Sequence, residues 1–217
     1  MGAPMITVLG RATSANVQRV MWTIAELGIE YKRVDVGGAF GGNDTPEYLA
    51  KNPHGLVPTI ETDDGRVMWE SAAIVRWLAL HDPERRLWPT SGQEELSADM
   101  WAEWAARYIE NPLLQMFIAL VRTRTADRDW GKIREIGSRI HKGLAAAEPF
   151  LAERPFLAGD RLSIADINFG LLLYRYYEME IERPDLPAVA AYYQRLTERP
   201  AYAEHVMIDF SFARPPE

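Results

Sequence analysis

The residues best placed to do chemistry form a short polar stretch early in the chain. Thr13, Ser14 and Asn16 stand directly before a run in which apolar residues recur at helical spacing. Their hydroxyl and amide groups can cap a helix, because the first backbone N–H groups of a helix lack partners within it. The same groups, together with the helix dipole, can also stabilise a bound anion. Two roles are therefore open for this stretch, a helix cap and an anion site.

Composition narrows the class of protein. The 217 residues are 47% hydrophobic and 25% charged, enough to bury the core of one large domain or two small ones. The net charge of -7 disfavours nucleic acid or an anionic membrane as the main partner, because both require clustered positive charge. The basic residues of 122–142 are interrupted by acids, which is typical of a solvated helical face. No apolar run reaches membrane-spanning length and the start is not that of a signal peptide, so we predict a cytoplasmic protein.

Cysteine is missing from the sequence altogether. This excludes disulfides, thiolate nucleophiles on the protein and cysteine-containing metal sites. His81, His141 and His205 share no metal-ligand spacing, so we expect no metal site. Any thiol in the chemistry of this protein must come from a ligand.

The first part of the chain alternates strand and helix patterns. A helix is predicted after Ser14 and ends at Gly28, and a short helix has Thr45 as its cap and Pro46 at its first position. A third helix is predicted from Ser71 to Leu80. The predicted strands are 6–9, 31–36, 57–62 and 66–69, the last two joined as a hairpin. The predicted order is βαβ followed by αββα.

From about Glu94 onward the patterns are helical. Pro112 is predicted to break or kink the first of these helices, and Ser163 with Asp166 form a capping box at the start of a later one. Further helices are predicted at about 130–151 and after Pro187. We predict three parts: an α/β domain at 1–83, a linker rich in proline and charge at 84–92, and an all-helical domain at 93–217.

The predicted strand and helix order, with Pro58 opening the third strand, resembles the thioredoxin fold. In that fold a redox pair of cysteines lies where the first strand turns into the first helix. Here that window reads Ser14, Ala15, Asn16, Val17, so the chain cannot exchange disulfides by itself. The fold class we predict is an N-terminal thioredoxin-like α/β domain followed by a C-terminal helical bundle.

A hydroxyl and an amide at a helix N-terminus suffice to activate a thiol. A free thiol of pKa near 8.5 is about 3% ionised at pH 7, and lowering its pKa to about 6.5 raises this to roughly three quarters. That shift requires about 2.7 kcal/mol, which one charge-assisted hydrogen bond of ~1.5 to 3 kcal/mol and a dipole can supply. Neither Ser14 nor Asn16 then needs to act as a base.

Four segments in order carry a closer resemblance. They are "TSANVQRV" (13–20), "NPHGLVPTI" (52–60), "ESAAIVRWL" (70–78) and "LAGDRLSIADI" (157–167). Over nearly its whole length the chain resembles the cytosolic glutathione transferases, most closely the bacterial ones that use Ser or Thr and Asn at the first helix. The resemblance implies an enzyme of detoxification that stabilises the glutathione thiolate and conjugates it to a small electrophile.

The resemblance also assigns roles around the sulfur atom. Ser14 would hydrogen-bond the sulfur, with Asn16 as a second donor. Val57, before a Pro58 expected to be cis, would pair its backbone with the cysteinyl part of glutathione. As simpler alternatives, Ser14 could only cap its helix and Pro58 could only open an edge strand.

The two ends of glutathione receive separate residues. Glu70 would meet the ammonium of the γ-glutamyl part, and Ser71 with the helix N-terminus behind it would meet the carboxylate. Alternatively, Glu70 is only a solvated strand end. His54 would meet the glycyl carboxylate, but Lys51 or the loop near Asn43 could make this contact instead.

The sequence says less about the acceptor pocket, which would hold the electrophile. Trp101, Trp104 and Tyr108 lie on one helical face, a pattern more typical of core than of a substrate pocket. The resemblance implies a pocket between this helix and the Ser14 loop. The candidates for it are Tyr108, Ile109, Met116 and Tyr174.

The resemblance further implies a homodimer in which the N-terminal domain of one subunit packs on the helical domain of the other. Glutathione would be the co-substrate, with no other cofactor. Alternatives are glutathione-dependent reduction of peroxides or disulfides, an isomerase, a dehalogenase, and a module that binds glutathione without catalysis.

Overall fold

The computed structural model describes residues 5–216, which divide into two compact units. One unit contains the described residues up to Arg86 together with Ala201–Ile208, and the other contains Leu87–Pro200 and the residues from Asp209 on. The sequence assigned all of 93–217 to the helical domain. Residues 201–208 belong to the first unit because Tyr202 is fully buried there, edge-on to Trp22 with 4.9 Å between the two ring centroids.

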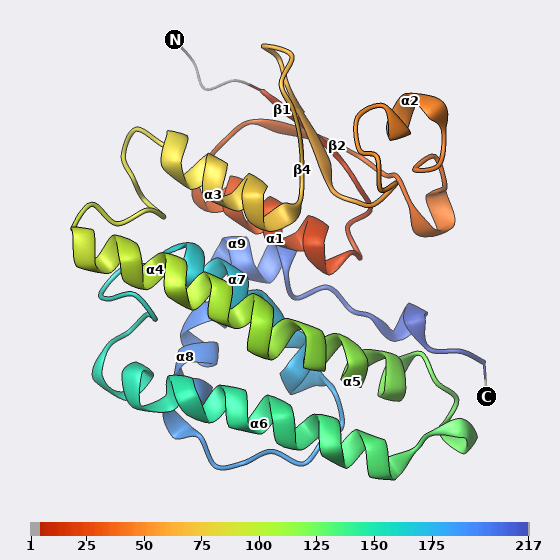
Figure 1. The fold of residues 1–217 in the computed structure, drawn as a ribbon, viewed down its shortest axis with the longest axis vertical. Coiled ribbons are helices and arrows are strands. Elements are labelled where there is room, and N and C mark those ends of the chain that lie inside the picture. Colours follow the sequence, from red (N-terminus) through yellow and green to blue (C-terminus); the bar gives the residue numbers. More distant parts are fainter. Residues whose placement is uncertain (1–4, 217) are drawn as a thin grey trace. The chain divides into compact units, whose positions relative to one another are not determined.

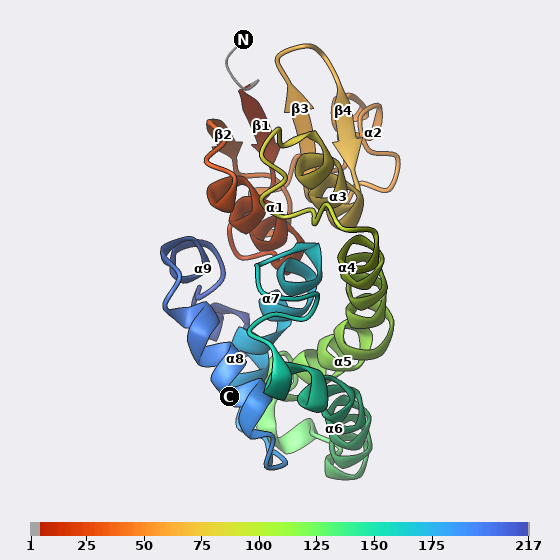
Figure 2. The ribbon, with the colours of Figure 1, turned by 90° about the vertical axis from the view of Figure 1, so that its left-hand side faces the viewer.

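The first unit has a four-stranded sheet in the order β2-β1-β3-β4. The central strand β1 runs parallel to β2 and antiparallel to β3, which pairs with β4 as a hairpin. Helices α1 and α3 pack side by side on one face of this sheet (Figures 1 and 2). The strands are Ile6–Leu9, Tyr31–Val34, Thr59–Thr62 and Val67–Trp69, and the helices are α1 (Ala15–Glu26), α2 (Pro46–Leu49), α3 (Ser71–His81) and most of α9 (Pro200–His205). The predicted βαβ and αββα order is confirmed.

The helix that carries the candidate site, α1, ends as the sequence predicts. Gly28 has φ 58°, a left-handed conformation that a residue without Cβ adopts at little cost. Its N–H donates to the carbonyl of Ala25, and the next N–H, of Ile29, donates to Ile24, both at 3.1 Å. These two bonds form a Schellman motif, which satisfies the last carbonyls of α1.

The second unit is helical. Its elements are α4 (Gly92–Trp104), α5 (Asn111–Val121), α6 (Trp130–Glu153), α7 (Ile164–Glu178) and α8 (Pro187–Thr197). Pro112 does not break the chain's helical course. A π-helical segment, Ala105–Glu110, connects α4 to α5 (Figure 1). Pro112 falls in the first turn of α5, where its missing N–H costs least.

The start of α7 is the most buried polar point of the helical unit. The predicted capping box is present, and the Asp166 side chain is fully buried. Asp166 accepts from the N–H groups of Leu157 (3.0 Å) and Ser163 (2.8 Å), and from the hydroxyls of Ser163 and Tyr192 (3.0 Å each). Burial raises the pKa of Asp166, and these four bonds oppose that rise. They therefore anchor α7 to α8 and to the loop before it.

Candidate active site

Ser14 occupies the turn between β1 and α1, at the N-cap position of the helix. Its backbone is extended (φ -81°, ψ 125°), and its carbonyl accepts from the N–H of Gln18 at 2.9 Å. Its N–H donates to the carbonyl of Arg11 at 3.2 Å. The Ser14 hydroxyl, however, makes no capping hydrogen bond to α1. The side chain at the N-cap therefore leaves its hydroxyl available to a ligand.

A hydrogen-bonded chain connects the first turns of α1 and α3. The hydroxyl of Ser71 donates to Oδ1 of Asn16 at 3.2 Å and accepts from Nη1 of Arg19 at 3.0 Å. Arg19 is only 3% exposed, which makes it a buried cation at the base of the site. The sequence analysis missed Arg19, although its place three residues after Asn16 on the same helical face was a usable signal.

The loop before β3 presents an unpaired stretch of backbone. The Val57–Pro58 peptide is cis, as predicted. Among the described residues, neither the N–H nor the C=O of Val57 makes a backbone hydrogen bond. An extended peptide can therefore pair with Val57 in the way that one strand adds to another.

Gly10, at the end of β1, is a second residue that the sequence analysis missed. A Cβ at position 10 would lie 2.5 Å from Cγ2 of Val17 and 3.3 Å from Cβ of Val57. Only glycine permits α1 and the Val57 loop to approach the end of β1 this closely. The signal in the sequence was the glycine that directly follows a buried strand.

Glu70 and Ser71 lie where β4 passes into α3. Glu70 has φ 68° and ψ 104°, a conformation that non-glycine residues seldom adopt and that is frequent at functional sites. Its side chain is exposed and makes no capping bond to α3. Ser71 is buried at the first position of α3, where backbone N–H groups favour an anion.

The three candidates for the glycyl carboxylate differ in their surroundings. Lys51 already forms an ion pair with Glu61, and the Asn43 amide donates to the carbonyl of Gly55 at 2.7 Å. His54 is exposed, with its ring edge-on to Trp69 at 5.4 Å between ring centroids. Of the three, His54 has the side chain that is least engaged with other residues.

The four predicted acceptor residues have different environments in the helical unit. Tyr108 is 53% exposed and, with Trp104, lines a cavity of about 510 Å³. Ile109 and Met116 are each 1% exposed, so their side chains are part of the core. Tyr174 is partly buried, with its ring 6.2 Å from that of Phe210, and burial raises its pKa.

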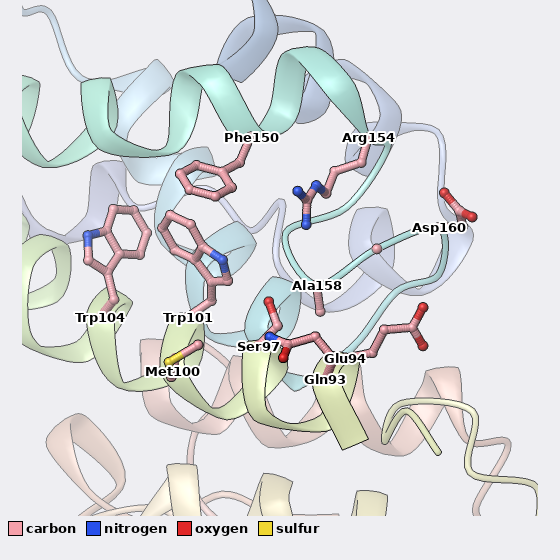
Figure 3. Close-up of a pocket in the computed structure, with 11 residues that line it drawn as sticks. Gln93, Glu94, Ser97, Met100, Trp101, Trp104, Phe150, Arg154, Ala158 and Asp160 are labelled. Carbon is pink, nitrogen blue, oxygen red and sulfur yellow. The ribbon is translucent and has the colours of Figure 1, made fainter. Parts of the chain in front are cut away.

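A larger cavity of about 730 Å³ lies between α4 and the end of α6 (Figure 3). Trp101 lines it, edge-on to Trp104 at 4.8 Å and to Phe150 at 5.0 Å between ring centroids. Arg154 lies over the Phe150 ring at 5.5 Å. The aromatic stripe seen in the sequence therefore lines a cavity on one side, while Trp104 packs against Phe169 at 5.2 Å on the other.

In the part of the chain that the structure describes, no three histidine or acidic side chains gather as a metal site. Within residues 5–216, no helix has both the length and the apolar character needed to cross a membrane.

Comparison with known proteins agrees with this geometry. Residues 13–81 match the family described as "Glutathione S-transferase, N-terminal domain", and residues 135–200 match "Glutathione S-transferase, C-terminal domain". Glutathione S-transferase GstB of Escherichia coli K12 is 35% identical over 95% of this chain and 100% of its own length.

Two solved structures extend the comparison. The theta class glutathione S-transferase of Xanthomonas axonopodis pv. citri, solved with glutathione bound, has a TM-score of 0.88 and 42% identity, covering 95% of this chain and 99% of that one. Glutathione S-transferase I of maize, solved with an atrazine glutathione conjugate, has a TM-score of 0.82 and 26% identity, covering 94% and 98%. The chain belongs to the glutathione S-transferase family, and the predicted thioredoxin-like domain followed by a helical domain is confirmed.

Proposed function

We propose that in this glutathione S-transferase the Ser14 hydroxyl holds the thiolate of glutathione, which then attacks a small electrophile. One observation carries the proposal: the hydroxyl lies at the start of α1 but makes no capping bond to the helix. Asn16 serves as a second donor, since its Oδ1 accepts from Ser71 and its NH2 group makes no hydrogen bond to a described residue.

The groups around Ser14 bind the remaining parts of glutathione. The cysteinyl part pairs with the free backbone of Val57, beside the cis Pro58. Glu70 meets the γ-glutamyl ammonium, and Ser71 with the first turn of α3 meets its carboxylate. His54 meets the glycyl carboxylate.

Arg19 acts as a positioning residue in this arrangement. Its buried guanidinium fixes the Ser71 hydroxyl, which in turn fixes the Asn16 amide. Arg19 thus positions both Ser71, which contacts the γ-glutamyl end, and Asn16, which contacts the sulfur.

For the electrophile, the exposed ring of Tyr108 and the partly exposed ring of Tyr174 make contact, while the buried Ile109 and Met116 act through packing. Replacing Tyr108 by Ala should then change KM for the electrophile and leave KM for glutathione unchanged. Glutathione is the co-substrate, no further cofactor takes part, and the protein acts in the cytoplasm.

A homodimer is also part of the proposal. Leu96 and Met100 on α4 and Phe150 on α6 expose apolar side chains, which is typical of a surface that another protein covers. The partner we propose is a second copy of this chain. Sedimentation at micromolar concentration should give twice the mass of one chain, and a single-chain mass would remove this part.

The experiment that tests the proposed function compares three activities of the purified chain. Glutathione conjugation to an aryl halide should exceed glutathione-dependent reduction of a peroxide or of a disulfide. The variant Glu70→Gln should raise KM for glutathione with little change in kcat, because Glu70 contacts the end of glutathione remote from sulfur. Binding of glutathione without turnover of any electrophile would contradict the proposal.

A further inference from the structure

Arg11 is a cation that the rest of the site leaves without a partner. Its side chain is partly buried, and it makes no side-chain hydrogen bond or ion pair with any described residue. Other arginines of the same unit are paired: Arg33 with Asp35, and Arg66 with Asp64. An arginine stays charged at any pH that proteins tolerate, so a partly buried one favours the arrival of an anion.

The loop after β2 is shaped around this side chain. A Cβ at Gly38 would lie 3.0 Å from Nε and 3.2 Å from Cζ of Arg11. Gly37 and Gly38 both have positive φ, 81° and 60°, which residues with a side chain rarely adopt. The Arg11 side chain therefore lies close to a stretch of backbone where a side chain would crowd it.

The guanidinium is also close to the proposed thiol site. A Cβ at Gly37 would lie 3.2 Å from both Nη1 of Arg11 and Cγ1 of Val57, so these two atoms border the same point. The Arg11 carbonyl accepts from the N–H of Ser14. Arg11 therefore shares its turn with Ser14, the residue proposed to hold the thiolate, and its guanidinium lies beside Val57, the residue proposed to hold the cysteinyl backbone.

We propose that Arg11 binds a carboxylate of one of the two bound reactants. This inference rests on the proposed function, because it needs glutathione at Ser14 and Val57. The planar fork of arginine matches a carboxylate with two parallel hydrogen bonds, which a lysine cannot do.

Two sources can supply that carboxylate. One is the glycyl end of glutathione, which Arg11 would bind together with His54, and the other is a carboxylate on the electrophile. In the second case the thiolate displaces a halide from the carbon beside the carboxylate: a sulfur–carbon bond forms, the carbon–halogen bond breaks and the halide leaves with the electron pair.

Equilibrium binding distinguishes the two sources and needs no turnover. Calorimetry would compare glutathione with its glycyl ethyl ester, and S-carboxymethylglutathione with its neutral amide, S-carbamoylmethylglutathione. Each pair differs in one carboxylate. The proteins are the unchanged chain, Arg11→Gln, Arg11→Lys and the control Arg66→Gln, which removes an exposed arginine from the β3–β4 hairpin.

Arg11→Gln should weaken binding of the acidic member of one pair about tenfold or more and leave the other member unchanged, since one charge-assisted hydrogen bond is worth at least that factor. The pair that responds identifies the source. Arg11→Lys should recover only part of the loss, and Arg66→Gln should change nothing. An equal change in affinity for all four ligands, or no change, would overturn the role of Arg11. The activity of Ser14→Ala tests the proposed function alone, so the two proposals can fail separately.

Discussion

Replacing Ser14 by Ala separates the two roles that its position allows. A serine that caps a helix typically contributes about 1 kcal/mol to stability. Here the hydroxyl makes no capping bond, so the free energy of unfolding should fall by less than about 0.5 kcal/mol. Any larger effect of Ser14→Ala should therefore be on chemistry and not on folding.

The size of that chemical effect follows from thiolate stabilisation. Losing the hydroxyl should raise the pKa of bound glutathione by one to two units, which corresponds to about 1.4 to 2.7 kcal/mol. If bound glutathione titrates near pH 6.5, a rise of about 1.5 units reduces the thiolate at that pH roughly sixteenfold. Near pH 8.5 the same change costs less than about twofold, because the thiol then ionises unaided.

The assay is a titration of thiolate absorbance in the ultraviolet with glutathione bound, paired with turnover at the two pH values. Ser14→Thr should retain most of the shift, because it keeps the hydroxyl. Asn16→Ala makes an informative comparison, since it also removes the acceptor of the Ser71 hydroxyl. It should therefore raise KM for glutathione at both pH values, whereas Ser14→Ala should change that KM little near pH 6.5 and more near pH 8.5, where the bound thiol is ionised.

The reasoning fails if the titration curve of Ser14→Ala coincides with that of the unchanged protein. If Asn16→Ala shifts the curve instead, Asn16 is the donor to sulfur. A loss of 1 kcal/mol or more in urea unfolding of Ser14→Ala would indicate that the hydroxyl caps α1 in solution.

Three further changes test other parts of the structure. Gly10→Ala places a Cβ 2.5 Å from Cγ2 of Val17 and should cost about 1 to 3 kcal/mol in urea unfolding, together with affinity for glutathione; an unchanged unfolding midpoint would contradict the close approach. Glu70→Gly relieves a positive φ, so the free energy of unfolding should stay level or rise by up to about 2 kcal/mol while glutathione binds more weakly in calorimetry; a clear loss of stability would show that Glu70 is not strained. The hydrogen bond from Arg86 holds the pKa of Asp82 below its usual value, so this pair stabilises the folded protein at pH values above the pKa that Asp82 has in the unfolded chain, and the stabilisation is lost as pH falls. Arg86→Gln should therefore reduce the free energy of unfolding more near pH 7 than at about pH 3, and equal reductions at the two pH values would refute this.

Local features of the fold could be predicted because their signals are contained in a few neighbouring residues. The Schellman end of α1 follows from Gly28, and the capping box of α7 follows from Ser163 and Asp166. The π-helical segment before Pro112 could not be predicted. A proline excludes an ordinary helical hydrogen bond but does not specify whether the chain breaks, bends or adopts a wider turn.

Long-range packing limited the prediction of domains. Tyr202 is fully buried with Trp22, although 180 positions separate them, and nothing in the helical pattern near Tyr202 indicates this partner. An amphipathic helix shows that it buries a face but not against which element. The assignment of 201–208 to the first unit therefore required the structure.

In the candidate site, too, local features could be read from the sequence and long-range contacts could not. Ser14, Asn16 and the motif around Val57 could be named as candidates from the sequence because each lies at a recognisable place in its element. Arg19 and Arg11 were missed, because a charged residue near a helix start is most often solvated, and the spacing of Arg19 from Asn16 alone does not outweigh that expectation. Only the structure shows that one is buried and bonded to Ser71 and that the other lies against bare glycine backbone.

The hydrogen bonds around Ser71 indicate which of Ser14 and Asn16 contributes to glutathione binding and which to ionisation of its thiol. The Oδ1 atom of Asn16 is already committed to the Ser71 hydroxyl, and that hydroxyl is held by a buried arginine. Such a fixed amide is well suited to set the position of a ligand, because its orientation does not have to be found anew when the ligand binds. The Ser14 hydroxyl makes no hydrogen bond to the helix, so it can rotate to stay bonded to the sulfur as the charged thiolate becomes a neutral thioether. We therefore expect Asn16 to contribute mainly to binding and Ser14 mainly to the ionisation of the thiol.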